Sequence, residues 1–445
     1  MSHIQINTSK PLNGQCRVPG DKSISHRSAI FAAIAGGPSR IHNFFDGPSC
    51  LATLSVLGEL GIQMNKIATG TASTGLLVHG KGIDGLQEST NILNCGESGE
   101  TPELMMGLLV GQPFNSFLDG SGSLKWHPMD RIIAPLKGMG AQVIGRQDGK
   151  YVPLGIQRRR LNAVEYSLPV ASAQVKSALL LAGMYARGLT IIREPSLSQD
   201  HTERMLKAMN APVESLGSTI RGNTIYIEMP SKALSPLEFT IPGDISTTAF
   251  LLVAASIVPD SRVTILSVGI NPTRTGIVEA LREMGANIVY KNERTEAGEP
   301  IADLDVTYSE LRGTILGGRQ ILSMIDELPA LAVAATQAYG KTVVQDVREL
   351  RGAETERIAS LVGLLQKMGA YVEPTSDGFA ITGPTTLRGN LIESHNDALL
   401  TMAATVAGLA AKGSTYIYGA ERINHHFPGF DTTLQALGAD LETIQ

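Results

Sequence analysis

The sequence is poor in cysteine, in blocks of positive charge and in long apolar runs. Its 445 residues include three cysteines, Cys16, Cys50 and Cys95, whose spacing fits neither a zinc ligand set nor a disulfide framework. The formal net charge is −5, and no long block of Lys and Arg occurs, so a nucleic-acid partner has no support. Apolar runs such as 248–258 are too short to span a membrane. These shortages favour a cytoplasmic protein that acts on a small molecule.

The beginning and the length of the chain add two expectations. Residues 1–10 lack the charged and then apolar build of a signal peptide. A chain of 445 residues exceeds the size that one hydrophobic core supports, so we expect two domains of about 200 residues each.

A helical pattern recurs six times, with a period of about 70 to 85 residues. Each copy is an amphipathic segment that ends at a glycine or asparagine, where a left-handed residue closes a helix before a strand. These closing residues are Gly61, Gly140, Asn210, Gly285, Gly369 and Gly438. Six copies predict two domains of three repeats each, with a boundary near residues 239–244.

A second, more apolar helix precedes each of these segments. Two of the six begin in the similar stretches PGDKSIS, residues 19–25, and PGDISTT, residues 242–248. A helix that is apolar on most faces is expected to be buried, with the strands outside it. If the free N–H groups of these helices converge at one end of each domain, they favour an anion. Capped helix starts also occur in helical proteins that bind no anion.

Cationic side chains lie in the first turns of the first buried helix. The charges of Lys22 and Arg27 oppose the helix dipole and border an apolar run, so a negative partner is expected. Ser23 lies between them and adds a hydroxyl group. One interpretation is a salt bridge to a nearby carboxylate such as Asp21. The favoured one is a bound carboxylate or phosphate, because hydroxyl, ammonium and guanidinium groups together match such a ligand.

Six stretches of the chain resemble the 5-enolpyruvylshikimate-3-phosphate (EPSP) synthase family. They are PGDKSISHR, LPVASAQVKSALLLAG, DHTERML, PGDISTTAFLLVAA, NPTRTGIVEALREMGA and IDELPALAVAA. The resemblance implies an α/β fold of two inside-out α/β barrel domains joined by a hinge, each with three βαβαββ-type repeats. Residues 21–241 would form one domain and residues 1–20 with 242–445 the other, with the active site in the cleft between them. It further implies a monomer without a cofactor.

The resemblance also assigns roles to single residues. The positions that hold the shikimate end of the substrate in this family are matched by Lys22, Ser23, Arg27, Ser172 and Gln174. Asp326 matches the acid/base carboxylate of the family. Glu354 matches a catalytic glutamate, and Arg357 matches an arginine that binds phosphoenolpyruvate.

Other positions depart from the family, and most departures remove positive charge. Glu97, Glu100 and Glu103 stand where the family typically has Asn, Thr and Arg, and Trp126 and His127 stand where it usually has a basic pair. Gln199 and Leu399 each replace an arginine, and Ala353 replaces a lysine. His425 and His426 stand where some members have lysine. Like charges a few ångströms apart repel by about 4 kcal/mol at an effective dielectric near 20. With Glu103 in place of an arginine, we expect phosphoenolpyruvate binding to be lost.

Three interpretations of Glu97, Glu100 and Glu103 are open. Acidic residues in a first turn stabilise the helix by about 0.3 to 1 kcal/mol each. With a pKa raised by burial and by its neighbours, one of them, Glu103 above all, could be a general acid or base. They could also bind a cation, an amine or Mg²⁺. The histidines form no HxH or HExxH pattern, so no metal site is predicted.

The leading expectation is an enzyme that acts on a shikimate-type cyclic carboxylate, shikimate or shikimate 3-phosphate, by elimination without phosphoenolpyruvate. In such a lyase or dehydratase, Asp326, Glu354 or Glu103 removes a ring proton, and His127 or Lys22 assists the leaving group. The expected substrate-binding set is completed by Glu97, Glu100, His127, Gln199 and Arg357. One alternative is a true 3-phosphoshikimate 1-carboxyvinyltransferase that uses phosphoenolpyruvate, and another is a metabolite-binding homologue without activity.

Overall fold

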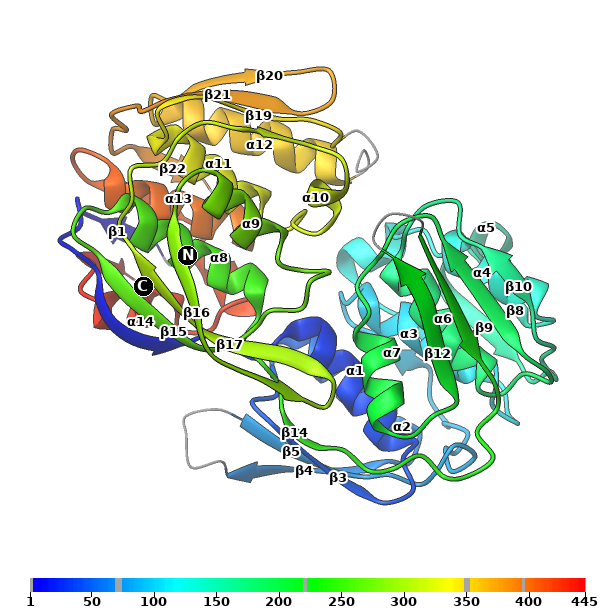
Figure 1. Ribbon diagram of the computed structural model, residues 1–445. Helices are drawn as coiled ribbons and strands as arrows, with labels where there is room; N and C mark the ends of the chain where they lie inside the picture. The colour runs from blue at the N-terminus through cyan, green and yellow to red at the C-terminus, as the bar shows by residue number, and fades with distance from the viewer. Residues whose placement is uncertain (1–2, 69–73, 219–221, 348–352, 394–396, 445) are drawn as a thin grey trace. The chain divides into compact units, whose positions relative to one another are not determined.

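The chain forms two compact units (Figure 1). The computed structural model describes residues 3–68, 74–218, 222–347, 353–393 and 397–444, with the backbone alone for 68, 218 and 353–356. Unit 1 comprises Met1–Pro19, Gly243–Arg294 and Pro300–Gln445, and unit 2 comprises Gly20–Pro242 and Thr295–Glu299. Among the described residues, no helix is both long enough and apolar enough to cross a membrane.

Unit 2 contains three four-stranded sheets, each with the same strand pattern. In spatial order the sheets are β14 (Glu238–Thr240), β3 (Pro38–His42), β5 (Thr74–His79) and β4 (Gln63–Ala68); β6 (Leu93–Asn94), β7 (Ser116–Asp119), β9 (Tyr151–Gln157) and β8 (Gln142–Gly145); and β10 (Glu165–Ser167), β11 (Thr190–Glu194), β13 (Gly222–Ile227) and β12 (Val213–Ser218). In each sheet the first pair is parallel and the other two pairs are antiparallel.

The helices of unit 2 fall into a buried set and an amphipathic set. The buried helices are α1 (Lys22–Ala33), α3 (Glu100–Leu109) and α6 (Ala173–Gly183). The amphipathic helices are α2 (Pro48–Glu59), α4 (Asp130–Gly138) and α7 (His201–Ala208), and two short segments are η1 (Gly122–Trp126) and α5 (Arg146–Gly149).

Unit 1 repeats this architecture. Its sheets are β22 (Leu391–Glu393), β23 (Thr415–Tyr418), β1 (His3–Ile6) and β24 (Leu441–Ile444); β2 (Asn13–Arg17), β15 (Arg262–Gly269), β17 (Glu299–Thr307) and β16 (Asn287–Glu296); and β18 (Ile315–Leu316), β19 (Gly340–Val344), β21 (Phe379–Gly383) and β20 (Tyr371–Pro374). The N-terminal strands β1 and β2 each complete a sheet of unit 1. The last strand before the return to unit 1, β14, completes a sheet of unit 2.

The helices of unit 1 divide in the same way. The buried ones are α8 (Ile245–Ile257), α11 (Leu328–Gln337) and α13 (Ala398–Ala410). The others are α9 (Gly276–Glu283), α12 (Ala353–Lys367) and α14 (Phe430–Ala436), with the short α10 (Arg319–Leu322) and η3 (Ala420–His425).

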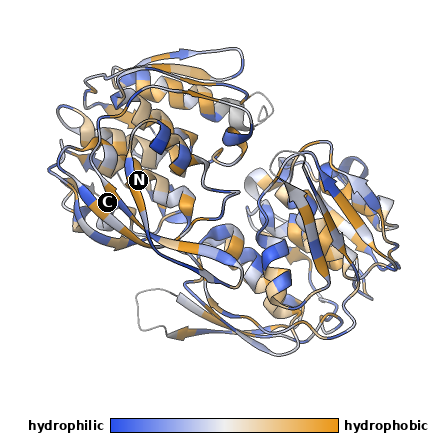
Figure 2. Cartoon of the chain, viewed as in Figure 1, coloured by the Kyte–Doolittle hydropathy of each residue, from blue (hydrophilic) through white to orange (hydrophobic). Residues whose placement is uncertain are grey.

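Helices lie inside and sheets outside in each unit, as the apolar pattern predicted. All 13 residues of α8 are buried, so it has no solvent face. The strands alternate instead: in β3, Ser39 and Ile41 are buried whereas Pro38 and Arg40 are exposed. Hydrophobic and hydrophilic residues accordingly follow one another along the strands in Figure 2. Each unit has its own hydrophobic core, which confirms the two-domain inside-out α/β fold.

The six repeat ends have the backbone conformation that the sequence predicted. The closing residues have positive φ angles of 87°, 95°, 59°, 97°, 91° and 104° at Gly61, Gly140, Asn210, Gly285, Gly369 and Gly438. Glycine and asparagine tolerate this left-handed region best, and it turns the chain out of each amphipathic helix.

Helices α3 and α6 of unit 2 pack closely at Gly107. A Cβ atom added at Gly107 of α3 would lie 2.3 Å from the carbonyl oxygen of Ala178 in α6. Because the neighbour is backbone, it cannot rotate away as a side chain would. Gly107 therefore sets how closely these two helices, which carry predicted site residues at their starts, approach each other.

We expect Gly107→Ala to lower the free energy of unfolding by about 1 to 3 kcal/mol, because overpacking forces α3 and α6 apart. The matched control is Gly363→Ala in α12, where an added Cβ meets nothing within 4 Å. That control should raise stability by about 0.5 to 1 kcal/mol, since glycine is a poor helix former. Urea unfolding of the three proteins checks this; a Gly107→Ala protein as stable as wild type contradicts the packing argument.

Candidate functional site

The predicted site residues of unit 2 lie at the starts of its three buried helices. Lys22 and Ser23 open α1, Glu100 opens α3, and Ser172 caps α6. The interpretation of a salt bridge to Asp21 gains no support, because no ion pair joins Asp21 to Lys22 or Arg27 among the described residues. Instead, Asp21 Oδ1 accepts a hydrogen bond from the backbone N of Ile24 at 2.8 Å and caps α1. Asp21 thus satisfies a backbone N–H group at the start of α1, and the cationic side chains have to find another negative partner.

Arg27 is the centre of this cluster. Its guanidinium is buried, and Nη1 lies 2.6 Å from Glu100 Oε1. Nε donates to Thr202 Oγ1 at 2.9 Å, and Nη2 donates to Ser177 Oγ at 3.1 Å. Nη1 also donates to the carbonyl oxygen of Ser23 at 2.9 Å. One side chain on α1 therefore connects α3, α6 and α7.

Glu100 is a charged partner and not a titrating acid or base near neutral pH. Burial raises the pKa of Glu100, but the charges of His26, Arg27 and Lys22 outweigh it and lower the pKa to about 2. Burial lowers the pKa of His26 to about 4, so His26 is charged at the low pH where Glu100 titrates but neutral at pH 7, where Arg27 is the adjacent cation. The interpretation in which burial and like charges raise the pKa of these glutamates is wrong for Glu100.

Glu103 is also paired, with His127. Glu103 Oε1 lies 3.0 Å from His127 Nε2, and the side chains are 15% and 41% exposed. The hydrogen bond to Glu103 raises the pKa of His127, against partial burial, which lowers it. This pairing makes imidazolium the favoured form at mildly acidic pH, with the carboxylate as its counter-ion.

The remaining predicted residues of unit 2 have local contacts. Ser172 Oγ accepts from the backbone N of Val175 and donates to Gln174 Oε1, each at 3.4 Å. Glu97 lies against η1, since a Cβ added at Gly122 would be 2.4 Å from its Oε1. Gln199 is half-buried in the loop before α7.

Two partners of Arg27, Ser177 and Thr202, were not predicted as site residues. Both lie in stretches that carried the family resemblance, QVKSALL and DHTERML. The signal that would have found them is a hydroxyl on the buried face of a helix, which has to find a hydrogen-bond partner in the core. Their burial is visible only in the folded chain.

In unit 1 the predicted residues lie at the starts of α11 and α12. Asp326 is exposed and directly precedes the buried Glu327, which occupies the N-cap position of α11 without a side-chain capping hydrogen bond. Arg357 of α12 donates from Nε to Asp397 Oδ2 at 2.7 Å, and Oδ1 of Asp397 caps α13. The side chain of Glu354 lies outside the described residues.

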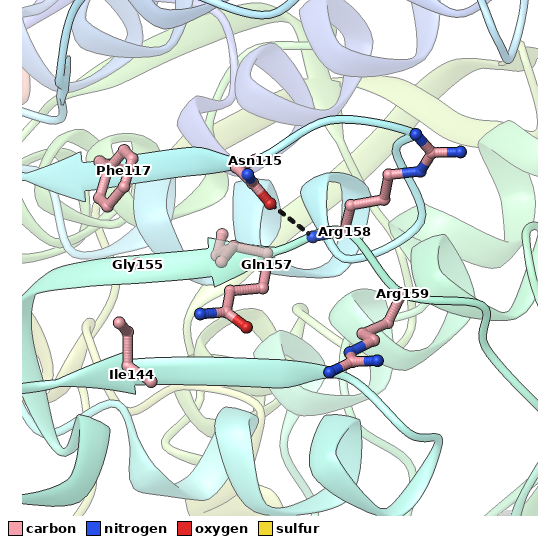
Figure 3. Close-up of a pocket in the computed structure, with 8 residues that line it drawn as sticks. Asn115, Phe117, Ile144, Gly155, Gln157, Arg158 and Arg159 are labelled. Atoms are coloured by element: carbon pink, nitrogen blue, oxygen red, sulfur yellow. Dashed lines mark hydrogen bonds between the residues drawn. The ribbon is translucent and has the colours of Figure 1, made fainter.

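A pocket of about 250 Å³ lies elsewhere in unit 2 and contains none of the predicted site residues. Figure 3 shows Phe117, Gly155 and Ile144 on neighbouring strands, with Arg158 and Arg159 at one end. The backbone N of Arg158 donates to Asn115 Oδ1 at 2.9 Å, which fixes the strand end. Without an acid or a nucleophile in its wall, this pocket offers binding surface but no acid/base chemistry. We therefore assign the chemistry to the helix starts.

The helix starts are not arranged as a metal centre in the part of the chain that is described. No group of three or more His, Cys, Asp or Glu side chains there is placed to hold a metal ion. Glu100 and Glu103 each have a cation or an imidazole as partner. The Mg²⁺ interpretation of these glutamates gains no support from this geometry.

Comparisons with known proteins agree over the length of the chain. The sequence pattern of a family described as EPSP synthase (3-phosphoshikimate 1-carboxyvinyltransferase) matches residues 6–434. The 3-phosphoshikimate 1-carboxyvinyltransferase of Desulforamulus reducens is 46% identical over 432 residues, which cover 97% of this chain and 98% of that protein. The protein of that name from Syntrophomonas wolfei is 47% identical over 435 residues, which cover 97% and 99%.

A solved structure gives the same result for the fold. The EPSP synthase from Acinetobacter baumannii has a TM-score of 0.91 to this chain at 38% sequence identity, and the match covers 100% of both chains.

We expect Glu100→Gln to remove the charge that compensates Arg27 and to lower the free energy of unfolding at pH 7 by about 3 kcal/mol. Because the folded-state pKa is lowered, the wild-type contribution is present above the ordinary value of 4.5 and is lost as the pH falls toward 2. Urea unfolding from pH 7 to pH 3 should therefore show the two proteins converging. Glu88→Gln, an exposed control, should follow wild type; a constant gap between wild type and Glu100→Gln would contradict the pairing.

Proposed function

This chain belongs to the EPSP synthase family, and we propose that it transfers a carboxyvinyl group from phosphoenolpyruvate to a hydroxyl group of shikimate 3-phosphate. The observation that carries the proposal is the full-length similarity to curated relatives named 3-phosphoshikimate 1-carboxyvinyltransferase. The match to the family pattern over residues 6–434 supports the same proposal.

The expectation of an elimination without phosphoenolpyruvate is wrong. The curated relatives, which match 97% of this chain, are named for carboxyvinyl transfer and not for a lyase reaction. The expectation treated each acidic replacement as an added negative charge. The folded chain pairs Glu100 with Arg27 and Glu103 with His127, so neither carboxylate acts as an isolated charge.

The cluster of unit 2 is proposed to bind the ring substrate. Lys22 and Ser23 offer an ammonium and a hydroxyl, which suit the carboxylate, hydroxyl and phosphate groups of shikimate 3-phosphate. Arg27 is buried and bonded to Glu100, and it supports this end of α1 by donating to the carbonyl oxygen of Ser23. Ser172 and Gln174 add neutral hydrogen-bonding groups at the start of α6. The free N–H groups of three buried helices favour negative charge at the same helix ends.

The acidic residues of α3 have a narrower proposed role. Glu103 holds His127 in a position where the imidazole can donate a proton or a hydrogen bond. Glu97 and Gln199 complete the proposed substrate-binding set as polar neighbours. Glu100 acts through Arg27, since its carboxylate already contacts the guanidinium.

Carboxyvinyl transfer needs an acid/base group and an anion-binding group, and unit 1 offers candidates for both. Asp326 is exposed at the start of a buried helix, where a carboxylate can accept the proton of the acceptor hydroxyl. Arg357 presents a guanidinium held by Asp397, which suits the carboxylate of phosphoenolpyruvate. Glu354 and Lys22 remain proposed participants in catalysis.

We expect the purified protein to release phosphate and form an enolpyruvyl ether only when both shikimate 3-phosphate and phosphoenolpyruvate are present. Phosphorus and proton NMR follow both products in one sample. Asp326→Asn should lower kcat by about 100-fold or more, because the amide cannot take up a proton. The control Asp84→Asn changes an exposed residue of unit 2 and should retain wild-type kcat.

One outcome would contradict the proposed reaction, and another would contradict the proposed role of Asp326. Phosphate release from shikimate 3-phosphate alone would indicate elimination and not transfer. Wild-type kcat in Asp326→Asn would remove Asp326 from the acid/base role while leaving the transfer reaction itself intact.

A further inference from the structure

A buried polar network in unit 1 joins three of the stretches that carried the family resemblance. Glu327 comes from IDELP, Ser246 from PGDIS and Arg274 from NPTRT. Their exposed fractions are 2%, 8% and 7%, so each side chain needs partners within the protein. None of the three was predicted as a site residue, although Glu327 directly follows Asp326.

The hydrogen bonds of this network run in one direction. Arg274 Nη2 donates to Ser246 Oγ at 2.6 Å, and Ser246 Oγ donates in turn to Glu327 Oε1. Arg274 Nη2 also lies 3.6 Å from Glu327 Oε1 and 3.7 Å from Asp244 Oδ1. The first residues of α11 are thereby tied to the start of α8.

Glu327 shares the guanidinium of Arg274 with a second carboxylate. One guanidinium, that of Arg274, faces Asp244 and Glu327, and Asp326 adds a third carboxylate next in the chain. Asp244 has a further role, because its Oδ1 accepts from the backbone N of Ser246 at 2.8 Å and caps α8. Protonation of Glu327, which is buried, lowers the repulsion among these three acidic side chains.

The direction of the pKa shift agrees with this charge count. Burial raises the pKa of Glu327 to about 8; Arg274 lowers it, whereas Asp326 and Asp244 raise it. Glu327 is therefore largely protonated at neutral pH and becomes ionised as the pH rises through 8.

We propose that Glu327 is a positioning residue for the proposed carboxyvinyl transfer: anchored by Ser246 and Arg274, its uncharged carboxyl group holds Asp326 in place at the start of α11. The inference rests on the proposed function, because Asp326 is its acid/base group. When Glu327 becomes ionised, its negative charge lies next to Asp326 in the chain, and it competes with Asp244 for the guanidinium of Arg274. The rate should then fall although Glu327 touches no substrate.

The first test compares kcat and KM of wild type, Glu327→Ala and Glu327→Gln between pH 6 and pH 10. Glu327→Ala should lose about 100-fold in kcat with KM within about threefold, because a misplaced catalytic group costs rate and not binding. Glu327→Gln keeps the shape of the uncharged carboxyl group and should recover at least about tenfold of that loss at pH 7. It should also lack the fall in kcat near pH 8 that wild type shows. Glu310→Gln, an exposed control, should keep that fall.

Three results overturn the inference. A fall in kcat near pH 8 that persists in Glu327→Gln assigns the titration to another group. A Glu327→Gln protein that folds as wild type by circular dichroism but is no more active than Glu327→Ala indicates a direct chemical role. A KM that rises as much as kcat falls indicates substrate binding.

A second measurement does not depend on activity. Carbon NMR of ¹³C-labelled glutamate should show one carboxyl group that titrates near pH 8 in wild type, disappears in Glu327→Gln and titrates at lower pH in Asp326→Asn. No shift in Asp326→Asn would overturn the inference, because the two carboxyl groups would then be uncoupled. If this coupling is present but the protein transfers no carboxyvinyl group, the proposed function fails and the coupling of the two carboxyl groups stands.

Discussion

The pairing of a buried guanidinium with a carboxylate is the interaction on which the rest of the candidate site depends. Arg27 is almost without solvent contact where helices α1, α3, α6 and α7 meet, and a cation in that position needs a negative partner at short range. Glu100 supplies it at 2.6 Å. The first turn of α3 is therefore held to α1 by charge as well as by packing, and the acidic residue that departs from the family pattern has a structural reason to be there.

Unit 1 also places guanidinium groups next to acidic side chains, although Glu327 is uncharged at neutral pH. Arg357 contacts Asp397, and Arg274 faces Asp244 and Glu327. In each case the carboxylate lies at the start of a buried helix, and Asp244 and Asp397 also cap theirs. Charges at these helix starts are therefore arranged as pairs and small networks. The electrostatic potential at the binding site therefore cannot be predicted from a count of acidic and basic residues in the sequence.

The periodic features were predictable and the pairings were not. The six closing residues from Gly61 to Gly438, and the six apolar helices, follow from local sequence, because helix ends and apolar faces are decided by neighbours in the chain. Arg27 and Glu100 are 73 residues apart, and Ser246 and Glu327 are 81 apart, so only the fold brings them together. The family resemblance assigned a role to Asp326 but none to Glu327, because the burial of Glu327 has no signature in the local sequence. Reading Glu100 and Glu103 without their partners also led to the wrong reaction.

Calorimetric titration of the wild-type protein with shikimate 3-phosphate at pH 7 and moderate ionic strength tests the central claim most directly. If Glu100 and Glu103 are neutralised by Arg27 and His127, the anion should bind with a dissociation constant near or below about 100 μM, an affinity of about −5.5 kcal/mol. Absence of binding at millimolar ligand, with shikimate itself binding, would contradict the account, because the acidic residues would then repel the phosphate in spite of their partners.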